Sequence, residues 1–142
     1  MTTLGVHHLA VVVSELARAE AFYADVLGCE ISRSSDSGID FSFFGHQMSA
    51  HLRPDAAARN GIFALRGGRT VPIPHFGVVL LMEDWERLSK KLEDDSTIDW
   101  IERPRIRFEG KPGEQGSFFI RDPSGHALEF KGYRSLEHAF AY

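Results

Sequence analysis

Two nearly identical apolar runs, each opened by a histidine, constrain the fold of this chain more than any other feature. The first is HLAVVV, from His8 to Val13, and the second is HFGVVL, from His75 to Leu80. Short valine-rich runs of this kind are typical of buried strands. Downstream, His51 and Glu129 each lie between apolar neighbours, with a basic residue two places on. The sequence therefore predicts one unit present in two copies, with three histidines and a carboxylate at matching positions.

The first copy, about residues 5–53, is predicted to contain a strand, a helix and three more strands. Ser14 can cap the helix and Gly28 can end it. Between them, apolar residues recur at helical spacing: Leu16, Ala19, Phe22, Tyr23, Val26 and Leu27. The strands are predicted, with turns at glycines, over residues 6–13, 30–34, 39–44 and 47–53.

The second copy, about residues 75–133, follows a connector over 54–74 that is rich in glycine and proline. It repeats the order with a strand at 75–82, a helix at 83–93, and strands at 98–102, 116–121 and 126–132. A tail at 134–142 is predicted to form a short helix. The second copy is longer, and the excess falls in a predicted loop over 103–115, where the stretch Arg107 to Gln115 is the candidate lid over a substrate.

Composition places the chain among ordinary globular proteins. Its 142 residues are 43% hydrophobic and 25% charged, which predicts a single domain over residues 1–142. The net charge of -4 argues against nucleic-acid or membrane partners, which favour basic patches. No apolar stretch approaches the roughly 20 residues that span a bilayer. The lone Cys29 excludes an internal disulfide and is expected to pack in the core, which favours a cytoplasmic location.

The repeated histidines and the carboxylate predict a metal site. Imidazole and carboxylate groups together are the usual ligands of catalytic divalent metals. Glu129 strengthens this prediction because it lies between Leu128 and Phe130, so its carboxylate should face a cavity and need a cation or a donor. His8, His51, His75 and Glu129 are therefore the candidate ligands.

Two longer stretches carry a resemblance to a known family. The region from His8 through FYADVLG (22–28) and the segment RDPSGHALEF (121–130) resemble the opening and closing elements of the vicinal oxygen chelate superfamily. This superfamily includes glyoxalase I, extradiol dioxygenases, fosfomycin-modifying enzymes and bleomycin-resistance proteins. Residues 39–47, 71–77 and 107–115 further resemble a subgroup of small, predicted extradiol-type dioxygenases. The resemblance implies an α+β fold in which two βαβββ repeats form a cup-shaped mixed sheet around a metal site.

The resemblance also implies roles for the candidate ligands. His8, His75 and Glu129 match the two-histidine, one-carboxylate set of extradiol enzymes. Glyoxalase-type members usually carry a carboxylate or an amide at the position of His51, so a histidine there departs from their pattern. His51 is predicted to be either a fourth metal ligand or a catalytic acid–base residue.

The number of ligands separates the possible activities. Three ligands leave three positions on an octahedral Fe(II), enough for a bidentate catecholate and dioxygen, and this dioxygenase is the leading prediction. Four ligands leave two positions, which suits a glyoxalase-type isomerase or lyase. A third alternative is a non-enzymatic, drug-binding dimer of the bleomycin-resistance type. The expected cofactor is Fe(II), with Mn, Ni or Zn as alternatives, and the expected partners are a small-molecule substrate and a second copy in a homodimer.

Overall fold

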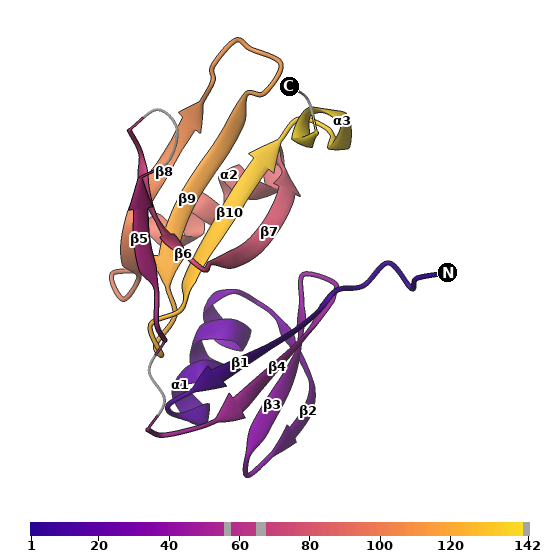
Figure 1. Ribbon diagram of the computed structural model, residues 1–142, viewed down its shortest axis with the longest axis vertical. Helices are drawn as coiled ribbons and strands as arrows, with labels where there is room; N and C mark the ends of the chain where they lie inside the picture. The colour runs from indigo at the N-terminus through magenta and orange to yellow at the C-terminus, as the bar shows by residue number, and fades with distance from the viewer. Residues whose placement is uncertain (56–57, 65–67, 141–142) are drawn as a thin grey trace. The chain divides into compact units, whose positions relative to one another are not determined.

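A computed structural model describes residues 1–55, 58–64 and 68–140. The chain divides into two compact units, one of residues 1–59 with 122–125 and the other of residues 60–121 with 126–142. Each unit contains a four-stranded mixed sheet built in the order strand, helix and three strands (Figure 1). The structure thus confirms the predicted α+β class and the two βαβββ repeats. That the two repeats form one domain stays a prediction.

The first unit is a sheet with one polar face and one apolar face. Its elements are β1 (His8–Val13), α1 (Leu16–Glu20) with a π-helical continuation (Ala21–Val26), β2 (Glu30–Ser35), β3 (Gly38–Phe43) and β4 (His46–Leu52). The strand order is β1-β4-β3-β2, and β1 runs parallel to β4. Side chains alternate along each strand, so that Val13, Phe41 and Met48 are buried in the core. His8 and His51 are exposed residues of this unit.

The predicted first helix differs from the structure in its second half. Over Ala21–Val26 the chain is a π-helix rather than an α-helix, and the Leu27 amide donates to the Phe22 carbonyl five residues back at 3.0 Å. The wider turn ends at Gly28, whose φ of 78° favours glycine, as expected for a residue that ends a helix.

The second unit repeats this plan and adds a hairpin. Its elements are β5 (Gly61–Ala64), β6 (Thr70–Ile73), β7 (Phe76–Leu81), α2 (Met82–Glu93), β8 (Asp99–Arg107), β9 (Gln115–Arg121), β10 (Ala127–Tyr133) and α3 (Leu136–Ala139). The main sheet has the order β7-β10-β9-β8, with β7 parallel to β10. Trp85 of α2 packs over Gly116 and Gly132, and its indole N–H donates to the Phe130 carbonyl at 3.1 Å. None of the helices in the described part of the chain is long and apolar enough to span a membrane.

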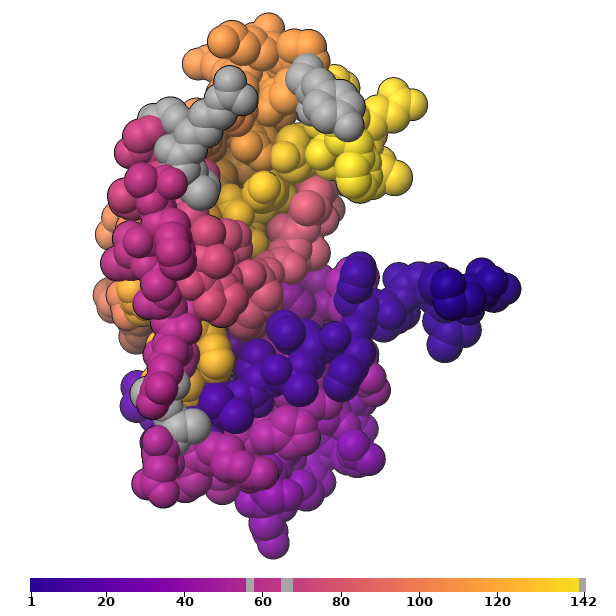
Figure 2. All heavy atoms as spheres, in the orientation of Figure 1, coloured from indigo at the N-terminus to yellow at the C-terminus, as the bar shows by residue number. Residues whose placement is uncertain are grey.

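The connector over 54–74 contains an antiparallel hairpin of β5 and β6, which the sequence analysis does not predict. Figure 2 shows residues of this hairpin on the surface of the second unit. The glycines and prolines of this segment indicated a connector, and Pro72 argues against a strand because proline cannot donate to a ladder. In a two-stranded sheet both strands are edges, and a proline is tolerated there.

The predicted loop over 103–115 is also too long, because β8 extends to Arg107. The pairing of β8 with β9 shifts register between Glu102 and Arg105, and Pro104 occupies this irregularity. The remaining turn is held at Glu114, which accepts from the Gly110 amide at 2.7 Å and pairs with Arg134 at 2.9 Å. Arg105 and Arg107 therefore lie on a strand rather than in the predicted loop.

The DPSG segment, residues 122–125, forms a turn and belongs to the first unit. Asp122 accepts one hydrogen bond from the Tyr23 hydroxyl at 2.7 Å and another from the Ser124 amide at 2.9 Å. Burial, with the nearby Asp122 charge, raises the pKa of Tyr23 well above its ordinary value. The phenol therefore stays protonated and keeps donating to Asp122.

Cys29 is buried, as predicted, and this has a measurable consequence. Burial raises the pKa of its thiol to about 11, so roughly one molecule in a thousand carries the reactive thiolate at pH 8. We expect a chromogenic disulfide reagent at pH 8 to label Cys29 at least a hundredfold more slowly in the native protein than in 6 M guanidinium. Rapid stoichiometric labelling of the native protein would contradict this burial.

Candidate metal centre

His75 and Glu129 lie side by side in the second unit. His75 directly precedes β7, and Glu129 lies in β10 opposite Gly77. The imidazole Nε2 is 3.1 Å from the carboxylate Oε2. Gly77 permits this approach, because a side chain at that position would overlap the backbone of Glu129. The structure thus brings two of the four predicted ligands together.

The hydrogen bond of His75 determines which ring nitrogen carries the proton. Its Nδ1 is 2.7 Å from the Pro72 carbonyl oxygen, which can only accept. In the neutral ring Nδ1 must therefore hold the hydrogen, and Nε2 keeps its lone pair. A backbone carbonyl at the second ring nitrogen is typical of histidines that bind metals, because it fixes the tautomer and the ring orientation.

The two oxygens of Glu129 face different groups. Oε1 accepts from the Ser117 hydroxyl at 3.0 Å and lies 3.8 Å from Arg69. Oε2 faces His75 and lies 4.0 Å from the ammonium of Lys131. The side chain is 9% exposed, so these neighbours replace most of the water around the carboxylate. Oε2 and the Nε2 lone pair of a neutral His75 are therefore the pair of atoms that a cation could bridge.

A pocket of about 260 Å³ contains this pair and is lined by His75, Phe76, Gly77, Val78, Val79, Glu129 and Lys131. One imidazole nitrogen and one carboxylate oxygen suit a divalent transition metal. Among the described residues, no group of three or more histidine, cysteine, aspartate or glutamate side chains is close enough to hold an ion. The chemistry of the pair fits a metal, and a further ligand is needed to complete a centre.

The first unit places its two candidate ligands apart. His8 lies opposite Gln47, whereas His51 lies opposite Val12, so the two are offset by four residues on adjacent strands. At about 3.3 Å per residue this is roughly 13 Å along the sheet. His75 and Glu129 are offset by only two residues. The structure therefore does not bring His8 and His51 together as it does His75 and Glu129.

The strand registers also correct the predicted equivalence of His51 and Glu129. Glu129 lies opposite the residue two places after His75. In the first unit, the position two places after His8 is Ala10, and the residue opposite Ala10 is Ser49. His51 is therefore two residues beyond the true counterpart of Glu129. It shares the same sheet face, roughly 7 Å further along β4.

His51 lines a pocket of about 310 Å³ with Arg33 and Asp40. Arg33 pairs with Asp40 at 2.7 Å. A hydrogen bond from Ser49 and the Arg33 guanidinium, with a smaller contribution from His51, hold the pKa of Asp40 below its ordinary value. An ionised carboxylate beside His51 can orient the imidazole and stabilise its protonated form. Sequence reasoning missed Asp40, although the alternation of β3 places it on the polar face.

Comparison with known proteins identifies the family. The family model described as the Glyoxalase/Bleomycin resistance protein/Dioxygenase superfamily matches residues 5–130. The chain belongs to this superfamily. Its members typically bind divalent metals, and the group includes glyoxalases, fosfomycin-resistance enzymes and dioxygenases. The resemblance to the vicinal oxygen chelate superfamily is thereby confirmed, whereas the extradiol subgroup stays a prediction.

Solved structures of this superfamily resemble the chain over nearly its whole length. A glyoxalase/bleomycin resistance protein/dioxygenase from Alicyclobacillus acidocaldarius is 31% identical, with 96% of this chain and 97% of that one covered and a TM-score of 0.77. The fosfomycin resistance protein FosX from Listeria monocytogenes is 17% identical, with 96% and 98% covered and a TM-score of 0.70. At 17% identity, the similarity to FosX shows a shared fold and nothing more. A search of the curated proteins found no match.

Proposed function

We propose that this protein is a metal-dependent dioxygenase of the extradiol type, acting on a small catechol-like substrate with Fe(II). The observation that carries the proposal is the 3.1 Å approach of His75 Nε2 to Glu129 Oε2, with the histidine tautomer fixed by the Pro72 carbonyl. Family membership supports a metalloenzyme of the vicinal oxygen chelate type. We further propose that the enzyme acts as a homodimer.

Three ligands complete the proposed centre. His75 and Glu129 come from the second unit, and the sequence supplies His8 as the third. Two histidines and one carboxylate are the set that non-haem Fe(II) oxygenases use. When bound, Fe(II) would supply open positions for a catecholate and dioxygen. Ser117 holds one oxygen of Glu129 in place, so the other oxygen keeps a fixed direction.

His51 is proposed to move a proton rather than to bind the metal. Its four-residue offset from His8, and the presence of Ser49 at the position that corresponds to Glu129, support this role. Asp40, an ionised carboxylate in the same pocket, would stabilise the imidazolium that forms when His51 accepts a proton from the substrate hydroxyl.

Anaerobic reconstitution with Fe(II), followed by measurement of oxygen uptake over a panel of catechols, tests the proposed reaction. We expect one dioxygen to be consumed for each substrate, together with the yellow absorbance of a ring-opened product. An absence of uptake, combined with isomerisation of hemithioacetals by the Ni(II) or Zn(II) protein, would contradict the proposal and favour the glyoxalase-type alternative.

Substitution of His51 distinguishes its two predicted roles. We expect His51→Ala to keep a full complement of iron and to lower kcat on the order of 10²- to 10⁴-fold, the usual effect of removing an acid–base residue. Metal content and kcat should be measured on the same preparation. His7→Ala is the matched control, since His7 is another exposed histidine of the first unit. Loss of iron in His51→Ala would instead make His51 a ligand.

A further inference from the structure

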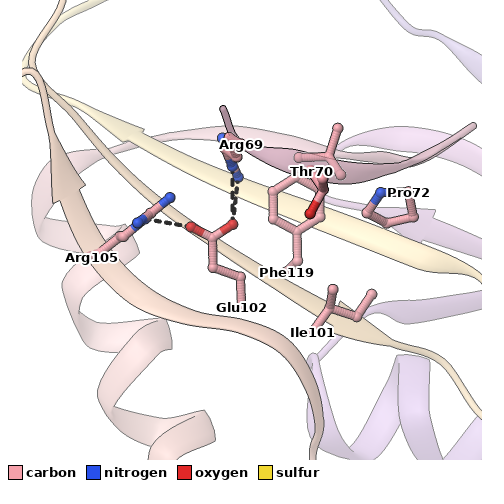
Figure 3. A pocket seen from close by; sticks show the side chains of 8 residues that line it. Arg69, Thr70, Pro72, Ile101, Glu102, Arg105 and Phe119 are labelled. Atoms are coloured by element: carbon pink, nitrogen blue, oxygen red, sulfur yellow. Dashed lines mark hydrogen bonds and ion pairs between the residues drawn. The ribbon is translucent and has the colours of Figure 1, made fainter. Parts of the chain in front are cut away.

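An arginine cluster lies next to the proposed metal centre in the second unit. Arg69 donates from Nε and Nη2 to one oxygen of Glu102, at 3.1 and 2.8 Å. Arg105 pairs with the other oxygen of Glu102. Figure 3 shows both guanidinium groups on Glu102, beside the ring of Phe119. These residues line a pocket of about 280 Å³.

A third arginine extends the cluster. Arg107 lines an adjoining pocket of about 420 Å³, which Arg69 and Arg105 also line. Its Nη1 is buried and has no hydrogen-bond partner among the described residues. Burial, followed by repulsion from Arg69 and Arg105, lowers the pKa of Arg107, and the opposing effects of the nearby carboxylates are smaller. This pocket is therefore lined by three arginines and no carboxylate, and one of the three carries a donor with no acceptor among the described residues.

The charges in this region are not balanced. Arg69 and Arg105 pair with Glu102, and Arg69 also lies 3.8 Å from Glu129, whereas Arg107 has no ion pair with either carboxylate among the described residues. Glu129 also lies 4.0 Å from Lys131 and 3.1 Å from His75. A purely structural arginine in a partly buried position normally has a carboxylate or carbonyl partner. An unpaired guanidinium N–H beside two other arginines is instead suited to an oxyanion, because its planar fork matches two oxygens of a carboxylate or phosphate group.

We propose that Arg69, Arg105 and Arg107 bind the anionic group of the substrate, a carboxylate or a phosphate-type oxyanion on a small molecule. This inference rests on the proposed function and narrows its substrate to an anionic one. Phe119 connects the two sites, since its ring lies 4.9 Å below the guanidinium of Arg69 and 5.0 Å from the ring of His75. A substrate held at the arginines would therefore lie within reach of the metal ligands.

Calorimetric titration of the full chain with benzoate, phenylphosphonate and benzyl alcohol tests the site directly. We expect at least one of the two anions to bind, more weakly at high salt, and the alcohol not to bind. Preference for benzoate or for phenylphosphonate identifies the group that the site takes. Arg107→Gln and Arg105→Gln should each weaken anion binding on the order of tenfold or more, the usual effect of losing a charge-assisted hydrogen bond.

Arg103→Gln is the matched control. Arg103 comes from the same strand but lies over the ring of Trp100, outside both pockets. This variant should bind the anions like the unaltered chain. Equal binding of the alcohol, or anion binding that survives both Arg105→Gln and Arg107→Gln, would overturn the proposal.

Oxygen uptake separates this inference from the proposed function. If the Fe(II) protein consumes oxygen with unsubstituted catechol and no anion binds, the anion site is wrong and the proposed function stands. If the anions bind in an arginine-dependent manner and no catechol supports uptake, the site is supported and the proposed reaction is wrong.

Discussion

Replacing Glu129 with alanine should abolish metal binding and catalysis together. The carboxylate is one of two donors that the second unit presents to a cation, and Ser117 holds it in place. Loss of residues that merely orient a ligand typically lowers metal affinity 10- to 100-fold, so loss of the ligand itself should cost on the order of hundredfold or more. We expect iron content to fall from about one per chain to below a tenth, as measured by mass spectrometry after anaerobic loading and desalting.

Glu129→Gln separates this effect from misfolding. The amide has the shape of the carboxylate and can still accept from Ser117, but it lacks the charge that Arg69 and Lys131 neutralise. Glu93→Gln, at the exposed end of α2, removes one negative charge away from the site and should leave iron content unchanged. Stoichiometric iron in a folded Glu129→Gln protein would contradict the assignment of Glu129 as a ligand.

Most strands of this fold could be predicted closely from the sequence because they are short apolar runs bounded by glycines and other turn residues. Predicted and observed bounds agree within two residues for most strands, as for β4, predicted over 47–53 and observed over His46–Leu52. The strand segments that the sequence analysis did not predict lie in stretches rich in proline or charged residues, which are typical of loops. Pro72 argued against a strand at β6, and Pro104 argued against a strand in the second half of β8.

The pairing of His75 with Glu129 could also be expected from the sequence, whereas the position of His51 could not. A shift of two residues along a strand keeps a side chain on the same face of the sheet. The pattern of apolar and polar residues therefore predicts the same face for Ser49 as for His51. Only the register between β1 and β4 distinguishes them. Similarly, Arg69, Arg105 and Arg107 lay in segments that resembled solvated loops, and nothing in their spacing indicated that they would share a pocket.

Gly77→Ala should destabilise the second unit more than any substitution on its surface. A Cβ at this position would overlap the carbonyl oxygen of Glu129 and lie 3.0 Å from its amide nitrogen. Both are backbone atoms of a paired strand, so neither can rotate away, and β7 must separate from β10. We expect a loss of about 3 kcal/mol or more in the free energy of unfolding, as measured from the urea midpoint.

The same substitution should weaken metal binding, because the separation of β7 from β10 moves His75 away from Glu129. Gly113→Ala is the matched control, since a Cβ there meets nothing within 4 Å, and its stability should change by less than about 0.5 kcal/mol. If Gly77→Ala unfolded at the same urea concentration as Gly113→Ala, the register of β7 against β10 would be wrong. The contact between the imidazole and the carboxylate depends on that register, so the metal centre would then need a different pair of ligands.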